Sequence, residues 1–154
     1  MSPDLKFEVI SRSQVPSNGS TQSTEQRGPV ILVVDDERII ADTLSIILTK
    51  RGFSVVTAYN AEAALELTEC VPPQLLLSDV MMGPGMDGTQ LALEVVSAFP
   101  RCKVLLFSGH SATRDLLEKT RELGHNFTLL TKPIHPSELL ARINDSFSGA
   151  PSYA

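Results

Sequence analysis

The sequence predicts an α/β fold, a doubly wound parallel sheet of five strands with five helices. Two observations predict this fold: short apolar segments recur between residues 29 and 147, and helical patterns fill the gaps between them. Chains that alternate strand and helix in this way form parallel sheets covered by helices. The predicted strands cover residues 30–34, 53–58, 74–78, 103–107 and 127–131.

Local signals place the first two helices. The segment from Arg38 to Lys50 has apolar residues at helical spacing, and Gly52 follows as a stop. Asn60 can cap a second helix that runs to Glu69. The two prolines at 72–73 then prevent that helix from continuing.

The other three helices follow the same rules. A helix over residues 89–98 presents leucine, valine and alanine on one face. Ser111 can cap a fourth helix that reaches Leu123, where Gly124 ends it. Pro136 suits the first turn of a fifth helix, whose apolar stripe extends to residue 147.

Composition indicates a soluble, single-domain protein that we expect in the cytoplasm. The 154 residues are 42% hydrophobic and 20% charged, which is ordinary for a globular domain. A net charge of −5 argues against direct nucleic-acid binding, and no apolar stretch is long enough to span a membrane or to act as a signal region. Cys70 and Cys102 lack metal-ligand spacing and are expected to be reduced thiols.

The domain is expected to occupy residues 29–147, with a tail on either side. Residues 1–28 are largely polar and low in hydrophobic periodicity, which predicts a disordered N-terminal tail. Residues 148–154 form a short C-terminal tail, too short for an output domain.

Four charged residues each stand where a predicted strand ends: the pair Asp35 and Asp36, then Asp79, then Lys132. Chemistry in an open α/β sheet collects beyond the carboxyl ends of the strands, so these side chains should converge. Crowded carboxylates raise one another's pKa unless a cation neutralises them, and a hard divalent ion with oxygen ligands suits such a cluster. The pattern therefore indicates a site for phosphate chemistry.

Four motifs follow one another along the chain: VVDDE at 33–37, SDVMMGPGMDG at 78–88, LLFSGH at 105–110 and TKP at 131–133. Together they resemble the receiver domain of bacterial response regulators. The resemblance covers about residues 29–147 and implies a flavodoxin-like sheet with strand order 2-1-3-4-5. It also implies that the Lys-Pro bond at 132–133 is cis.

The same resemblance implies a role for each site residue. Asp79 would be the phosphoacceptor, and Asp36 and Asp79 would bind Mg²⁺ directly. Asp35 would act on the metal mainly through water, and the backbone carbonyl of Met81 would complete the protein ligands. Lys132 and Ser108 would contact the phosphoryl group.

The sequence departs from the family pattern in two places. The loop that follows Asp79 is one residue longer than usual, and Gly83 is the residue that looks inserted. The aromatic residue that family members carry three positions before the lysine is Leu129 here, so either Phe127 replaces it or the aromatic switch is absent.

Histidines and the loop methionines suggest no second metal site. His110, His125 and His135 lack ligand spacing and a nucleophile partner.

The resemblance places the side chains of Met81 and His110 at the path by which water would reach the phosphorylated aspartate. Because Met81 cannot orient water, we expect slow hydrolysis.

These observations together predict a stand-alone response-regulator receiver in a two-component phosphorelay, not an enzyme with ordinary turnover. A sensor histidine kinase or phosphotransfer protein would donate the phosphoryl group. The face built from the fourth helix, fifth strand and fifth helix, roughly residues 112–147, would then signal to a separate downstream protein.

Two alternatives remain open. A Mg²⁺-dependent aspartyl phosphohydrolase usually carries its nucleophile after the first strand and a second acid two residues later; here that residue is Glu37, and no cap domain follows. A phosphorylation-independent interaction module of the same fold would show no covalent phosphate on Asp79.

Overall fold

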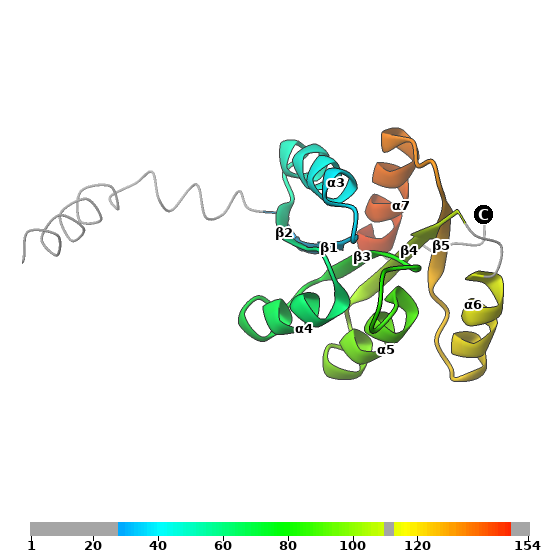
Figure 1. Cartoon of the computed structure of the whole chain (residues 1–154). Coiled ribbons are helices and arrows are strands. Elements are labelled where there is room, and N and C mark those ends of the chain that lie inside the picture. The colour runs from blue at the N-terminus through cyan, green and yellow to red at the C-terminus, as the bar shows by residue number, and fades with distance from the viewer. Residues whose placement is uncertain (1–27, 110–112, 149–154) are drawn as a thin grey trace, which may run out of the picture.

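A computed structural model describes residues 28–109 and 113–148, in which five strands alternate with five helices (Figure 1). The strands are β1 (Val30–Val34), β2 (Ser54–Ala58), β3 (Leu75–Asp79), β4 (Lys103–Ser108) and β5 (Thr128–Thr131). The helices are α3 (Arg38–Lys50), α4 (Ala61–Cys70), α5 (Gly88–Ala98), α6 (Thr113–Glu122) and α7 (Pro136–Ser148).

All five strands are parallel, in the order β2-β1-β3-β4-β5, which confirms the predicted fold and strand order. The chain first adds β2 on one side of β1 and then places β3 on the other. In this register Val34 pairs with Ser78, so the next residues, Asp35 and Asp79, lie side by side at the ends of β1 and β3. Ligand sites of doubly wound sheets form at such a reversal of strand order.

Helices cover both faces of the sheet. Figure 1 shows α3 and α7 on one face and α4, α5 and α6 on the other. Alternate residues of β1 face these two layers: Ile31 and Val33 pack with α3 and α7, whereas Leu32 and Val34 pack with α4 and α5. Because both faces are buried, the strands are continuous apolar runs rather than alternating ones.

Most predicted boundaries hold to within one or two residues. Asn60 caps α4 by accepting a hydrogen bond from the backbone N–H of Ala63 at 2.7 Å, as expected. The helix α5 begins at Gly88, one residue before the predicted start, with a capping box that was not predicted. The Asp87 side chain accepts the Gln90 N–H, and the Gln90 side chain accepts the Asp87 N–H.

Some predictions fall on residues that the structure does not describe. The disordered tail lies almost wholly outside the described residues, as do Ser111, the proposed cap of the fourth helix, His110, and residues 149–154. Within the described part of the chain, no helix has both the length and the apolar character needed to cross a membrane.

Candidate functional site

The predicted site residues meet at the carboxyl edge of the sheet. Asp35 and Asp36 follow β1, Asp79 ends β3, and Lys132 follows β5. Each of the three acids offers one carboxylate oxygen within 4.8 Å of the other two. Among the described residues no other group of three or more His, Cys, Asp or Glu is placed to hold a metal ion.

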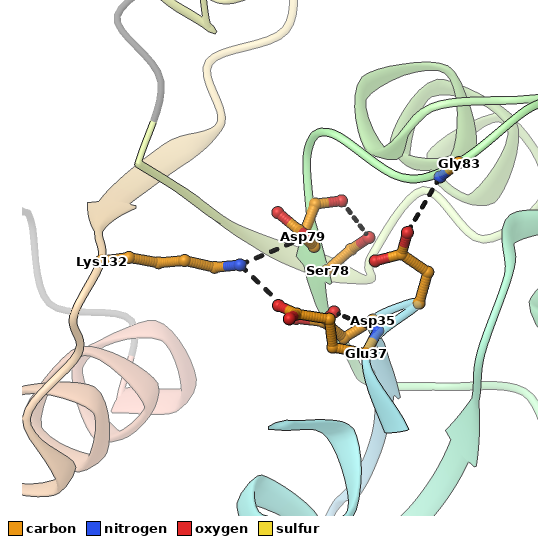
Figure 2. A network of polar contacts seen from close by, with 7 residues as sticks. Asp35, Glu37, Ser78, Asp79, Gly83 and Lys132 are labelled. Carbon is orange, nitrogen blue, oxygen red and sulfur yellow. Dashed lines mark hydrogen bonds and ion pairs between the residues drawn. The ribbon is translucent and has the colours of Figure 1, made fainter. Parts of the chain in front are cut away.

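Lys132 bridges two of these acids. Its Nζ lies 3.4 Å from Asp79 Oδ2 and 3.7 Å from Asp35 Oδ2, and Figure 2 shows the side chain extending between them. The peptide bond between Lys132 and Pro133 is cis, as predicted. The Lys132 ammonium also lies 5.2 Å from the centre of the Phe107 ring, a cation–π contact.

Burial raises the free energy of the ionised forms of Asp35 and Asp79. Asp35 is fully buried, and this burial, aided by the Asp79 carboxylate, raises the pKa of Asp35 to about 6. The hydrogen bond that Asp35 accepts from the Glu37 backbone N–H at 2.8 Å opposes the change. Burial also raises the pKa of Asp79, against the lowering effect of the Lys132 ammonium.

The residues present fit a hard divalent cation. Asp35 Oδ2 is buried and accepts no hydrogen bond, although the Lys132 ammonium is close. A buried carboxylate oxygen without a hydrogen-bond donor is satisfied by a cation, and clustered carboxylate oxygens suit Mg²⁺. Asp36 is exposed and lies at the entrance of the cluster, where solvent can supply the remaining ligands.

Ser108 and Met81 lie at the strand end and on the loop where the sequence predicts them. Ser108 is the last residue of β4, buried and paired with Thr131, directly before Lys132. Met81 lies on the loop that follows β3, with its side chain 44% exposed. The carbonyl of Met81 as a metal ligand remains a prediction.

The loop from residue 80 to residue 87 makes contacts that sequence reasoning missed. Gly83, the residue that looks inserted, donates its backbone N–H to Asp36 Oδ2 at 3.0 Å, the dashed line at Gly83 in Figure 2. Met86 donates its N–H to Glu62 Oε2 in α4 at 3.2 Å. The extra residue was visible in the sequence, but nothing there indicated what it contacts.

The structure places Phe127 away from Ser108. Thr131 pairs with Ser108 and Thr128 with Leu105, so Phe127 lies four positions before the level of Ser108. At about 3.3 Å per residue this amounts to about 13 Å. Phe127 instead stacks on His125, with ring centres 5.6 Å apart. Its position therefore does not suit a switch at Ser108.

Leu129 occupies the position that the aromatic switch has in the family pattern. It pairs with Leu106 and packs, partly buried, against the core on the α4 and α5 side of the sheet. Leu129 has no aromatic ring, so this position lacks the aromatic side chain of the family pattern.

The remaining candidates stay outside the cluster. His125 stacks on Phe127, and His135 is exposed just before α7. Both cysteines are free thiols, Cys70 exposed and Cys102 buried, and burial raises the pKa of Cys102 to about 11.

Known proteins share the fold of this chain. The family model of the response regulator receiver domain matches residues 31–144. A response regulator receiver domain protein from Clostridium thermocellum matches with a TM-score of 0.70 at 25% sequence identity, over 79% of this chain and 95% of that one. A CheY-like receiver domain protein from Methanospirillum hungatei gives 0.71 at 26% identity, over 79% and 95%. The signal receiver domain of an HD domain-containing protein from Pseudomonas fluorescens gives 0.73 at 27%, over 80% and 97%.

Proposed function

The chain belongs to the response regulator receiver domain family of two-component systems, and we propose that it accepts a phosphoryl group on Asp79. The donor would be a phosphorylated histidine of a sensor kinase or of a phosphotransfer protein. Receiver domains are generally signalling modules that bind Mg²⁺ at an acidic pocket, and the acids of this chain match that chemistry.

One observation carries the proposal: the three acids and one lysine converge at a single sheet edge. Asp79 is nearly buried and lies 3.4 Å from the Lys132 ammonium, an environment that fixes the carboxylate in place. Asp35 and Asp36 lie on the neighbouring strand end, within reach of the same ion. Acids scattered over solvated loops would not share one cation in this way.

The chemistry follows from these side chains. One carboxylate oxygen of Asp79 attacks the phosphorus, a P–O bond forms, and the P–N bond to the donor imidazole breaks with its electron pair left on nitrogen. Lys132 is placed to neutralise a phosphoryl oxygen during the transfer. Mg²⁺ held directly by Asp36, Asp79 and the Met81 carbonyl, and by Asp35 mainly through water, would offset the repulsion between the carboxylates and the incoming phosphoryl oxygens.

Signalling would use the face formed by α6, β5 and α7. Ser108 lies at the end of β4 next to Lys132. A contact between its hydroxyl and the phosphoryl group would be transmitted to the neighbouring strand β5. Since Leu129 stands in place of the aromatic residue, we propose that the phosphorylation signal reaches a downstream protein through backbone movement at β5 and not through an aromatic side chain.

No observation favours the two alternatives. Glu37, the second acid that a phosphohydrolase would need, is exposed at the N-cap of α3 and makes no side-chain capping bond. A module that works without phosphorylation has no need of a lysine placed between two buried acids.

Intact mass tests the proposal. The full chain is incubated with acetyl phosphate and Mg²⁺, and we expect the mass to increase by one phosphoryl group. The increase should be lost in Asp79→Asn, in Asp36→Ala and after addition of EDTA. Asp145→Asn, an exposed acid of α7, serves as the matched control and should label normally. Labelling that survives Asp79→Asn would contradict the assignment, as would labelling that EDTA does not change.

A further inference from the structure

We propose that the loop between β3 and α5 positions the Asp36 carboxylate for the metal, through the backbone N–H of Gly83. This inference rests on the proposed function, because it concerns the same Mg²⁺ site. Gly83 would be a positioning residue: it contacts a ligand of the metal and not the metal itself. Glu62 would support it by holding the far end of the loop.

Each of the three acids is held differently. Asp35 accepts the Glu37 N–H and faces the Lys132 ammonium. Asp79 is fixed by burial and by Lys132. Asp36 is exposed, and within the described residues its side chain accepts one hydrogen bond, the 3.0 Å bond from Gly83. Without that bond, no described contact would fix the rotamer of Asp36.

The bond leaves Asp36 free to bind a metal. A carboxylate accepts at about four lone-pair sites, so one N–H on Oδ2 leaves the whole of Oδ1 available. Hydrogen bonds to the ligands of a metal orient them and are typically worth about 10-fold to 100-fold in metal affinity. The contact therefore preorganises a ligand and does not compete with the ion.

A second carboxylate anchors the loop. Glu62, in the first turn of α4, accepts the Met86 N–H at 3.2 Å. Gly85, directly before Met86, has φ +102°, and a Cβ there would lie 3.0 Å from Glu62 Oε2. The loop thus passes close over Glu62 and turns there, because glycine tolerates a positive φ. The Glu62 carboxylate therefore anchors the loop independently of Asp36 and helps to set the position of the Gly83 N–H.

Gly83 offers a matched pair of substitutions. A Cβ at Gly83 would meet only Asp36 Oδ2, at 3.7 Å, which is an ordinary contact, so Gly83→Ala retains both the fold and the N–H. Gly83→Pro removes the N–H and nothing else from the donor set. Glu62→Ala and Glu62→Gln form the corresponding pair at the other end, since glutamine retains an acceptor oxygen.

Isothermal titration of the metal-free full chain with MgCl₂ tests the proposal. We expect Gly83→Pro to weaken Mg²⁺ binding about 10-fold, the lower end of the range for groups that orient a ligand. Gly83→Ala should retain the wild-type affinity. Glu62→Ala should weaken binding by a smaller factor, and Glu62→Gln should restore it. Thermal unfolding of each variant in EDTA should match wild type, which separates an effect on the site from an effect on the fold.

The possible failures are distinguishable. A wild-type chain that binds no Mg²⁺ would overturn the proposed function. Wild-type affinity in both Gly83→Pro and Glu62→Ala would overturn the positioning role alone, as would an equal loss in Gly83→Ala and Gly83→Pro. If Gly83→Pro unfolds in EDTA, the two Glu62 variants test the proposal instead. Equal Mg²⁺ affinity in Glu62→Ala and Glu62→Gln would then reject the positioning role of the loop.

Discussion

Replacing Asp35 by asparagine should stabilise the metal-free protein at neutral pH. Asp35 is fully buried, and its Oδ2 accepts no hydrogen bond, so its ionised form costs free energy in the fold. Asparagine has nearly the same shape and can still accept the Glu37 N–H through its amide oxygen. The substitution therefore removes the charge and retains the packing.

The size of the effect follows from the pKa of Asp35. Burial raises that pKa from an ordinary 3.8 to about 6. At about 1.4 kcal/mol per pKa unit, ionising the folded carboxyl costs about 3 kcal/mol in the free energy of unfolding. Lys132 loses one of its two partners in the variant, so we expect a net gain of about 1 to 3 kcal/mol.

The sign depends on pH. Folded Asp35 still holds its proton in the range where unfolded Asp35 has lost it. Proton binding by folded Asp35 therefore contributes to the stability of the wild-type protein. That contribution is present in full below the unfolded pKa of 3.8 and is lost as the pH rises through the folded pKa of about 6. The advantage of Asp35→Asn should be large at about pH 7.5 and close to zero at about pH 4.

Urea unfolding in EDTA, followed by far-UV circular dichroism, measures the difference, because the chain has no tryptophan to report by fluorescence. Asp36→Asn is the matched control: Asp36 is exposed, so the change should stay within about 0.5 kcal/mol. A destabilised Asp35→Asn at about pH 7.5, or an equal gain at both pH values, would refute the reasoning about burial.

Two further predictions concern the phosphorylated form and the extent of the domain. Met81→Asn should speed the decay of phosphorylated Asp79 about tenfold, about 1.4 kcal/mol of barrier, because asparagine can orient a water and a half-exposed methionine cannot. Decay is measured after donor removal, and an equal or slower rate in the variant would contradict it. Deleting residues 1–27 should leave acetyl phosphate labelling intact, because Gly28 retains its 3.0 Å bond to the Gly52 carbonyl. Lost labelling would show that these residues belong to the domain.

The sequence predicted the fold because its signals are local and redundant. Each strand is an apolar run buried on both faces, as with Ile31 to Val34, which are all fully buried. Glycines and prolines punctuate the runs, so their order alone gives the alternation. The start of α5 was predicted to within one residue, but its capping box was missed because Asp87 was interpreted only as part of a loop motif.

The part of the site formed by residues at the ends of strands was predictable from the sequence. Asp35, Asp36, Asp79 and Lys132 meet because parallel strands deliver their last residues to one edge, a property of topology alone. The contacts of the inserted loop were not predictable. They join Gly83 to Asp36, 47 positions earlier, and Met86 to Glu62, 24 positions earlier, through backbone N–H groups that carry no sequence signal.

Charge explains why this site needs a cation for its chemistry. Three ionised carboxylates and one ammonium leave two uncompensated negative charges at the sheet edge. Burial is the main cause of the raised pKa values of Asp35 and Asp79, and the neighbouring carboxylates add to it, so the metal-free protein holds protons on these acids to a higher pH than usual. In the proposed function, one bound divalent cation would cancel this surplus without protons and leave Asp79 ionised, the form that would attack phosphorus. Phosphorylation of Asp79 would then exchange the single charge of the carboxylate for the larger charge of an acyl phosphate and leave negative charge uncompensated again. The phosphorylated site would thus differ electrostatically from the resting one, and Lys132, which contacts both buried acids, is the side chain best placed to respond.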